Sequence, residues 1–187
     1  MTNIIQTPIK GVQIIEPKVF EDHRGYFFES FKSSDYQKQE FIQDNESKSS
    51  KNVLRGLHYQ LPPFAQTKLV RVIFGEILDV AVDIRRDSNT FGQWFKIVLN
   101  NDNKRQLLIP KGCAHGFIVL SDMAIVNYKV DAPYSPKHED GIKFDDKRLA
   151  IDWGLKDTPI VSAKDEVLPS FKPNELKEIN WQTSEFR

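Results

Sequence analysis

The stretch from residue 68 to residue 130 is a series of short apolar runs separated by turn residues, and this spacing constrains the fold more than any other feature. Within residues 77–84 every second residue is Leu, Val, Val or Ile, while Asp79 and Asp83 fall on the opposite parity. Such period-two alternation is typical of a half-buried strand. Several short strands at regular spacing predict an all-β sandwich or barrel, whereas a parallel sheet would need long helical segments between them. The runs cover residues 68–74, 77–84, 94–99, 106–109, 117–120 and 124–130.

Helical patterns are scarce in this sequence. We expect short helices only at residues 34–41, 145–151 and 174–179. The C-terminal segment is mixed and polar, and we expect it to wrap the outside of the barrel. No repeat, low-complexity tract or change in composition marks a linker, and 40% hydrophobic with 28% charged residues suffices for one core. The sequence therefore predicts a single domain over residues 1–187.

Composition and missing motifs exclude several classes of protein. The chain has 26 Lys and Arg against 26 Asp and Glu, so it lacks the basic excess that nucleic-acid binding requires, although a small phosphorylated ligand remains compatible. Cys113 is the only cysteine, which excludes an intrachain disulfide and a thiolate-rich metal site. No apolar run approaches the roughly 18 residues of a membrane span, and the first residues lack a secretory pattern. We therefore expect a cytoplasmic protein without membrane contact. Fingerprints of dinucleotide binding, P-loops, zinc proteases and serine hydrolases are absent.

Dense polar stretches interrupt the strand pattern, and such breaks are expected at functional sites. His58 lies in an apolar run, where it is either a hydrogen-bonded core histidine or a general base, since histidine changes protonation near neutral pH. Lys68 shares parity with two valines, so its ammonium either points into the barrel mouth or reaches solvent by its long stem. Tyr128 shares parity with apolar neighbours and is either a core aromatic or a functional phenol.

Two arginines stand beside glycines, which would let a phosphate approach the backbone closely. Arg24 and Arg55 are therefore candidate phosphate ligands, although both can equally be surface arginines in turns. Strict alternation places Arg55 and His58 on opposite faces of one strand. Both reach one pocket only if Gly56 marks a bulge or if the sheet is strongly curved. The sequence leaves this open.

Several short motifs follow one another in a specific order and spacing. The most specific is Leu-Arg-Gly-Leu-His at residues 54–58 with the downstream Lys68. Others lie at residues 79–85, 88–92, 109–112, 114–117, 128–129, 134–136 and 162–165. Together they resemble the dTDP-4-dehydrorhamnose 3,5-epimerase family, from roughly residue 11 to residue 169.

The resemblance implies a cupin-like β-barrel (jelly roll) that forms a homodimer by exchanging N-terminal strands. It implies His58 as the catalytic base, Asp165 as its paired carboxylate, Tyr128 as the acid on the opposite face of the sugar, and Lys68 as the group that steadies the enolate. Contacts with the nucleotide sugar are implied for Arg24, Glu29, Gln43, Asn45, Arg55, His115, Glu139 and Lys164, with Phe27 and Tyr134 packing near the thymine base. Of these, Arg24 and Glu29 are expected to reach a site across the dimer interface.

The implied reaction inverts C3 and C5 of dTDP-4-keto-6-deoxy-D-glucose, giving dTDP-4-keto-L-rhamnose for dTDP-L-rhamnose and cell-surface polysaccharide biosynthesis. The C4 carbonyl acidifies both C–H bonds, so acid–base groups suffice and the resemblance implies no cofactor and no metal.

Three alternatives remain. The first is an epimerase that inverts one carbon or uses a related nucleotide sugar. The second is a metal-dependent cupin, because Pro110-x-Gly112-x-x-His115 resembles the second cupin metal motif; the first motif, however, would need His-x-His where this chain has only His58. The third is a noncatalytic sugar-nucleotide-binding cupin, which the joint presence of base, carboxylate, lysine and tyrosine disfavours.

Overall fold

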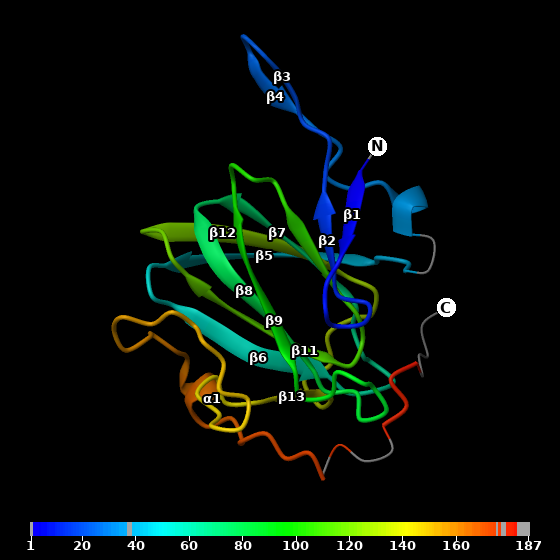
Figure 1. Cartoon of the computed structure of the whole chain (residues 1–187), viewed down its shortest axis with the longest axis vertical. Coiled ribbons are helices and arrows are strands. Elements are labelled where there is room, and N and C mark those ends of the chain that lie inside the picture. Colours follow the sequence, from blue (N-terminus) through cyan, green and yellow to red (C-terminus); the bar gives the residue numbers. More distant parts are fainter. Residues whose placement is uncertain (1, 37–38, 175, 177–178, 183–187) are drawn as a thin grey trace.

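The computed structural model describes residues 2–36, 39–174, 176 and 179–182, and this part of the chain is built almost entirely of antiparallel strands. One sheet contains β1 (Asn3–Gln6), β2 (Gln13–Glu16), β10 (Gln106–Ile109), β7 (Lys68–Phe74), β12 (Met123–Val130) and β5 (Gln43–Ser50), hydrogen-bonded in that order. The other contains β13 (Glu139–Gly141), β6 (Leu54–Gln60), β11 (Cys113–Val119), β8 (Glu76–Asp83) and β9 (Trp94–Asn100), again in spatial order. The two sheets pack face to face (Figure 1), so the predicted all-β jelly roll is confirmed.

Two apolar layers hold the sheets in place. The inner layer fills the space between the sheets, where Val70, Leu107 and Val126 of the first sheet meet Ile77 and Phe117 of the second. Alternation along each strand produces this layer, because every second side chain points inward. Each fully buried Leu or Val contributes about 1.5–3 kcal/mol by leaving water.

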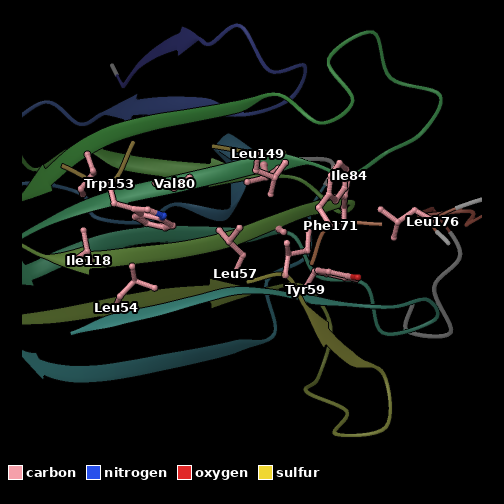
Figure 2. Packing of buried hydrophobic residues seen from close by; sticks show 14 of the residues in the cluster. Leu54, Leu57, Tyr59, Val80, Ile84, Ile118, Leu149, Trp153, Phe171 and Leu176 are labelled. Carbon is pink, nitrogen blue, oxygen red and sulfur yellow. The ribbon is translucent and has the colours of Figure 1, made fainter. Parts of the chain in front are cut away.

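The outer layer covers the far face of the second sheet. There Leu149, Trp153 and Phe171 of the C-terminal segment pack over Leu57 and Val80 (Figure 2). The indole nitrogen of Trp153 donates to the Phe144 carbonyl at 2.8 Å, so its one polar atom is satisfied. The second sheet is therefore buried on both faces.

This burial corrects the prediction for β8, which is not a half-buried strand. Its side chains Leu78 and Val80 face the outer layer, and Ile77 and Ala81 face the inner one. Asp79 and Asp83 are also fully buried. The prediction was wrong because alternation reports only where polar side chains fall, and here Asp79 packs against His115, which lines a cavity, while Asp83 faces a turn. Asp83 is satisfied there by Arg85, Ser88 and Thr90.

The predictions of helices were less accurate than those of strands. Residues 145–151 form turns rather than a helix. The Asp146 carboxylate accepts from the backbone of Arg148 and Leu149 at 2.9 Å, as a helix N-cap does, but Ala150 has a φ of +45° and ends the helical path after one turn. Residues 34–41 contain only the 3₁₀ turn η1 (Ser33–Tyr36), and residues 37–38 lie outside the described part. Half of the residues expected to form a helix at 174–179, namely 175, 177 and 178, also lie outside it. A short helix that was not predicted, α1 (Ala163–Glu166), is present. None of the described helices is long and apolar enough to cross a bilayer.

A separate hairpin of β3 (Phe20–Asp22) and β4 (Gly25–Phe27) projects from the body of the protein (Figure 1). Phe20, Tyr26 and Phe27 are exposed on it, with Phe27 at 67%. A two-stranded hairpin has no core of its own to bury such side chains. The ammonium groups of Lys104 and Lys18 lie over the Tyr26 and Phe20 rings, yet all three aromatic side chains of the hairpin remain largely exposed.

Candidate active site

A cavity of about 470 Å³ opens between the two sheets, beside the inner apolar layer. A smaller recess of about 250 Å³ shares His58, Lys68 and Tyr128 with it, so these three side chains stand where the two spaces meet. His58 comes from β6 in one sheet, whereas Lys68 and Tyr128 come from β7 and β12 in the other. The predicted base and the predicted acid therefore lie on opposing walls of one site.

The wall contributed by β5 is polar on its inner face. Gln43, Asn45, Ser47 and Ser49 alternate inward along this strand, and β5 pairs with β12 so that Asn45 stands opposite Tyr128. A strand that faces the core normally carries apolar residues there. A polar inner face needs a polar occupant, and here it borders both the cavity and the recess.

His58 and Asp165 form a hydrogen-bonded pair. The Nε2 atom of His58 lies 2.7 Å from Oδ1 of Asp165, whose Oδ2 accepts from the Gly56 amide at 3.2 Å. Helix α1 presents Asp165 to β6, and the N-cap Ser162 accepts from the Asp165 amide at 3.1 Å. Burial raises the pKa of Asp165, but the bond to His58 and the Gly56 amide outweigh it and hold that pKa below its usual range. An ionised carboxylate only accepts, so Nε2 carries the proton and Nδ1 is left as the basic nitrogen.

A bulge in β6 resolves the conflict between Arg55 and His58. His115 pairs with His58 and Phe117 with Arg55, so two residues of β6 oppose one of β11 in between. The bulge brings Arg55 and His58 to the same cavity. It requires glycine, because Gly56 has a φ of +111° and a Cβ there would lie 2.6 Å from the His115 carbonyl oxygen.

Burial shifts the pKa values of Lys68 and Tyr128, each in a direction that suits the predicted role of that residue. Burial lowers the pKa of Lys68 to about 8, against the attraction of Asp79 and Glu139, which raise it. Lys68 is therefore still largely an ammonium at neutral pH. Burial also raises the pKa of Tyr128, an effect that the charge of Arg55 partly opposes. Tyr128 consequently keeps its proton throughout the neutral range.

A second histidine–carboxylate pair stands beside the first. Nε2 of His115 lies 2.7 Å from Oδ1 of the fully buried Asp79. His115 is nearly buried and lines the cavity, and its strand neighbour on β6 is His58. The two imidazoles thus enter one cavity from adjacent strands, each fixed by its own carboxylate.

An ionic network borders the recess. Glu139 accepts from the Tyr134 hydroxyl at 2.5 Å and forms an ion pair with Lys164, the residue that precedes Asp165 in α1. Burial raises the pKa of Glu139, but its bonds to Lys164 and Tyr134 outweigh that effect and lower it. Gln43 also lines the recess, with its amide donating to Asn45 at 2.8 Å. The predicted residues Gln43, Asn45, Tyr134, Glu139 and Lys164 are therefore brought together with the central three.

Three predicted residues do not join this site. Arg24 and Phe27 lie on the projecting hairpin, where Arg24 is 79% exposed and bonded to Asp22, and they line a separate surface pocket. Glu29 follows the hairpin and is exposed. Within the described chain, the cavity and the recess are lined without them.

Comparison with known proteins decides the family. The family model described as dTDP-4-dehydrorhamnose 3,5-epimerase matches residues 6–173. The chain belongs to this family.

The similarity to individual members of the dTDP-4-dehydrorhamnose 3,5-epimerase family is extensive. The chain is 54% identical to a member from Shigella flexneri over 168 residues, which cover 87% of this chain and 92% of that relative. It is 52% identical to a member from Escherichia coli strain K12 over 171 residues, covering 89% and 92%. Among solved structures, the Legionella pneumophila dTDP-6-deoxy-D-glucose-3,5-epimerase in complex with dTDP-4-keto-L-rhamnose superposes with a TM-score of 0.85 at 48% identity, covering 92% of this chain and all of that one. A member from Elizabethkingia anophelis has a TM-score of 0.87 at 45% identity, covering 91% and 96%.

Sequence reasoning missed two polar side chains of this epimerase-family site. Ser47 Oγ and Asp79 Oδ2 are, among the described residues, the buried side-chain polar atoms without a hydrogen-bond partner. Ser47 lines the cavity from β5, and Asp79 holds His115. The clean alternation of β5 could have revealed Ser47, whereas Asp79 was assigned to an outward face.

The alternative of a metal-dependent cupin finds no support in the arrangement of side chains. Across the described ranges, no three His, Cys, Asp or Glu side chains come together as a metal-binding group. His58 and His115 each direct Nε2 to a carboxylate partner. The second half of the cupin metal motif thus serves a histidine–aspartate pair in this epimerase-family member.

Proposed function

We propose that this protein inverts C3 and C5 of dTDP-4-keto-6-deoxy-D-glucose to give dTDP-4-keto-L-rhamnose. The observation that carries the proposal is the placement of His58 and Tyr128 on opposite sheets, lining one cavity that also contains Lys68. Inversion of a carbon needs a base on one face and an acid on the other, and this cavity offers both. Relatives at 50–54% identity that carry the name of this activity support the same substrate.

In this mechanism Nδ1 of His58 removes the proton from C3 or C5, and the electron pair of the C–H bond passes through the ring onto the C4 oxygen. Asp165 stabilises the imidazolium that forms. The Lys68 ammonium neutralises the enolate; aimed charge of this kind is worth about 3–4 kcal/mol when one donor is removed. The Tyr128 hydroxyl then donates a proton to the same carbon from the opposite face. Solvent takes the abstracted proton from the His58 imidazolium and supplies one to the Tyr128 phenolate, so both groups are restored.

Incubation with dTDP-4-keto-6-deoxy-D-glucose in deuterium oxide tests the proposal, with exchange at each carbon followed by NMR. We expect deuterium at both C3 and C5 and a product of the L series. Deuterium at one carbon would assign a single-centre epimerase, and no exchange at either carbon would reject the function.

The pH dependence of turnover is a second prediction. Because the pKa of Lys68 in the free enzyme is lowered to about 8, kcat/KM falls as pH rises through about 8 and the ammonium is lost. Tyr128 does not cause this fall, since its pKa is raised above the ordinary tyrosine value. In Lys68→Arg the guanidinium stays charged, so the slower variant keeps its rate beyond pH 10. A fall near pH 8 that persists in Lys68→Arg would assign it to another group.

We propose further that the protein acts as a homodimer in which each β3–β4 hairpin completes the site of the other subunit. The support is that Arg24, Phe27 and Glu29 lie outside their own cavity on a projecting element, and that Phe20, Tyr26 and Phe27 are exposed on it. In this arrangement Arg24 meets the diphosphate and Phe27 the base. The single domain of residues 1–187 then lacks part of its catalytic site until a second subunit supplies the hairpin. Its C-terminal segment is wrapped over the outer layer.

Mixing two inactive variants tests this arrangement. Arg24→Ala keeps His58, and His58→Ala keeps Arg24, so a mixed dimer restores one complete site only if Arg24 acts across the interface. After co-refolding in equal amounts we expect about a quarter of the wild-type rate, since half of the dimers are mixed and each has one intact site. A mixture no faster than the separate variants, or a monomer by light scattering, would contradict the exchange.

A further inference from the structure

The buried carboxylate of Asp79 has a role that the reaction described above does not use. Asp79 lies at 0% exposure on β8, on the side that faces the space between the sheets. Oδ1 is bonded to His115, while Oδ2 is buried without a hydrogen-bond partner in the described chain. An ionised carboxylate is expensive to bury unless positive charge compensates it. A positive group facing the free oxygen would offset that cost.

The other carboxylates of the site already have hydrogen-bond or ion-pair partners. Asp165 accepts from His58 and the Gly56 amide, and Glu139 is paired with Lys164 and Tyr134. Among the positive groups of the cavity, Arg55 donates to Ser49 at 3.0 Å. Among these charged groups of the site, Oδ2 of Asp79 and the ammonium of Lys68 are left without an assigned partner.

Lys68 lines the same cavity as His115, the residue bonded to Asp79, so the Asp79 charge lies close enough to favour the Lys68 ammonium. Lys68 begins β7 in one sheet, and Asp79 lies mid-strand on β8 in the other. The other ionisable groups that line the cavity and recess with Lys68 come from β6, β11, β12, β13 and α1. Of these, only Glu139 also acts to keep the Lys68 ammonium charged, and that carboxylate is shared with Lys164.

We propose that Asp79 is a positioning residue for the epimerisation, whose single buried charge holds His115 through Oδ1 and sustains the Lys68 ammonium through the oxygen left free. His115 is thereby fixed with Nε2 as donor, so that Nδ1 is the nitrogen available to a ligand in the cavity. Lys68 remains an ammonium where burial alone would favour the neutral amine. The part played by that ammonium in turnover rests on the proposed function, whereas the charge coupling itself does not.

Direct titration of Lys68 tests the coupling without any substrate. The Lys68 Cε signal, labelled with ¹³C and assigned by its absence in Lys68→Arg, is followed against pH by NMR. In Asp79→Asn, which keeps the shape and a carbonyl oxygen for His115, we expect the midpoint to fall by about one pH unit or more. An unchanged midpoint would overturn the proposal.

Asp83→Asn is the matched control. Asp83 is equally buried, lies on the same strand and the same parity, and is paired with Arg85 rather than with a cavity group. We expect a comparable loss of thermal stability but no change in the Lys68 midpoint. An equal fall in both variants would mean general loosening and would also overturn the proposal.

A second variant and a pH profile test the proposal further. If Asp79→Asn does not fold, His115→Gln serves instead, because it retains the Asp79 charge and a donor for Oδ1. The Lys68 midpoint should then not fall. A fall would assign the effect to His115. In turnover, the alkaline limb of kcat/KM in Asp79→Asn should move down with the NMR midpoint. Should the wild type exchange no deuterium, the proposed function fails, while the titration still decides the role of Asp79.

Discussion

We expect His58→Asn to abolish deuterium exchange at both C3 and C5. His58 offers a free ring nitrogen on the wall opposite Tyr128, where it can accept a carbon-bound proton, and both exchanges begin with that step. General base catalysis contributes about 10²–10⁴-fold, so exchange should fall by at least this range. The measurement is NMR of dTDP-4-keto-6-deoxy-D-glucose in deuterium oxide with the purified variant.

Asp165→Asn is the informative companion to this variant. Asp165 Oδ2 accepts from the Gly56 amide, so the Asn carbonyl oxygen takes that position and the NH₂ group faces His58. The donor would force the proton from Nε2 to Nδ1, the nitrogen that should be free. We expect a loss close to that of His58→Asn with the His58 ring retained. Near-normal exchange in either variant would reject the assignment of His58 as the base, and unchanged affinity for dTDP in both would exclude a folding defect.

The strands were predictable because their sequence pattern is local. The predicted runs at residues 68–74 and 106–109 coincide with β7 and β10, since apolar runs with flanking turn residues carry both boundaries. The alternation along β5 was not used as a strand signal, because its inward residues are polar, and Gln43 and Asn45 were named as site residues only through the resemblance. The helix expected at 145–151 failed because Ala150 takes a left-handed φ of +45°, which its residue type does not reveal.

The sequence named many of the polar residues that line the cavity and the recess, but not their arrangement. Nothing in a strand pattern distinguishes an aspartate that faces solvent from one that is buried against a histidine, so the role proposed for Asp79 required the packing of both sheets. The bulge that unites Arg55 with His58 depends on the register between β6 and β11, which are far apart in sequence. Arg24 and Phe27 could be linked to the site only through the family, because within one chain they lie away from it.

Tyr128→Phe should separate exchange from inversion. Abstraction by His58 needs only one wall of the cavity, and the deuterated imidazolium can return a deuteron to the face from which the proton came. Inversion needs the donor on the other wall, and a phenyl ring has no proton to give. We expect inversion to fall by about 10²–10⁴-fold while exchange with retention falls much less.

Tyr134→Phe is the control for this separation. Its hydroxyl is bonded to Glu139 at the recess, so its loss should weaken binding without changing the ratio of inversion to exchange. The ratio is read in one NMR time course, from deuterium content and product configuration at C3 and C5. Equal loss of exchange and inversion in Tyr128→Phe would show that the phenol acts before reprotonation, for example by orienting the C4 carbonyl toward Lys68, and the two-walled mechanism would then need another acid.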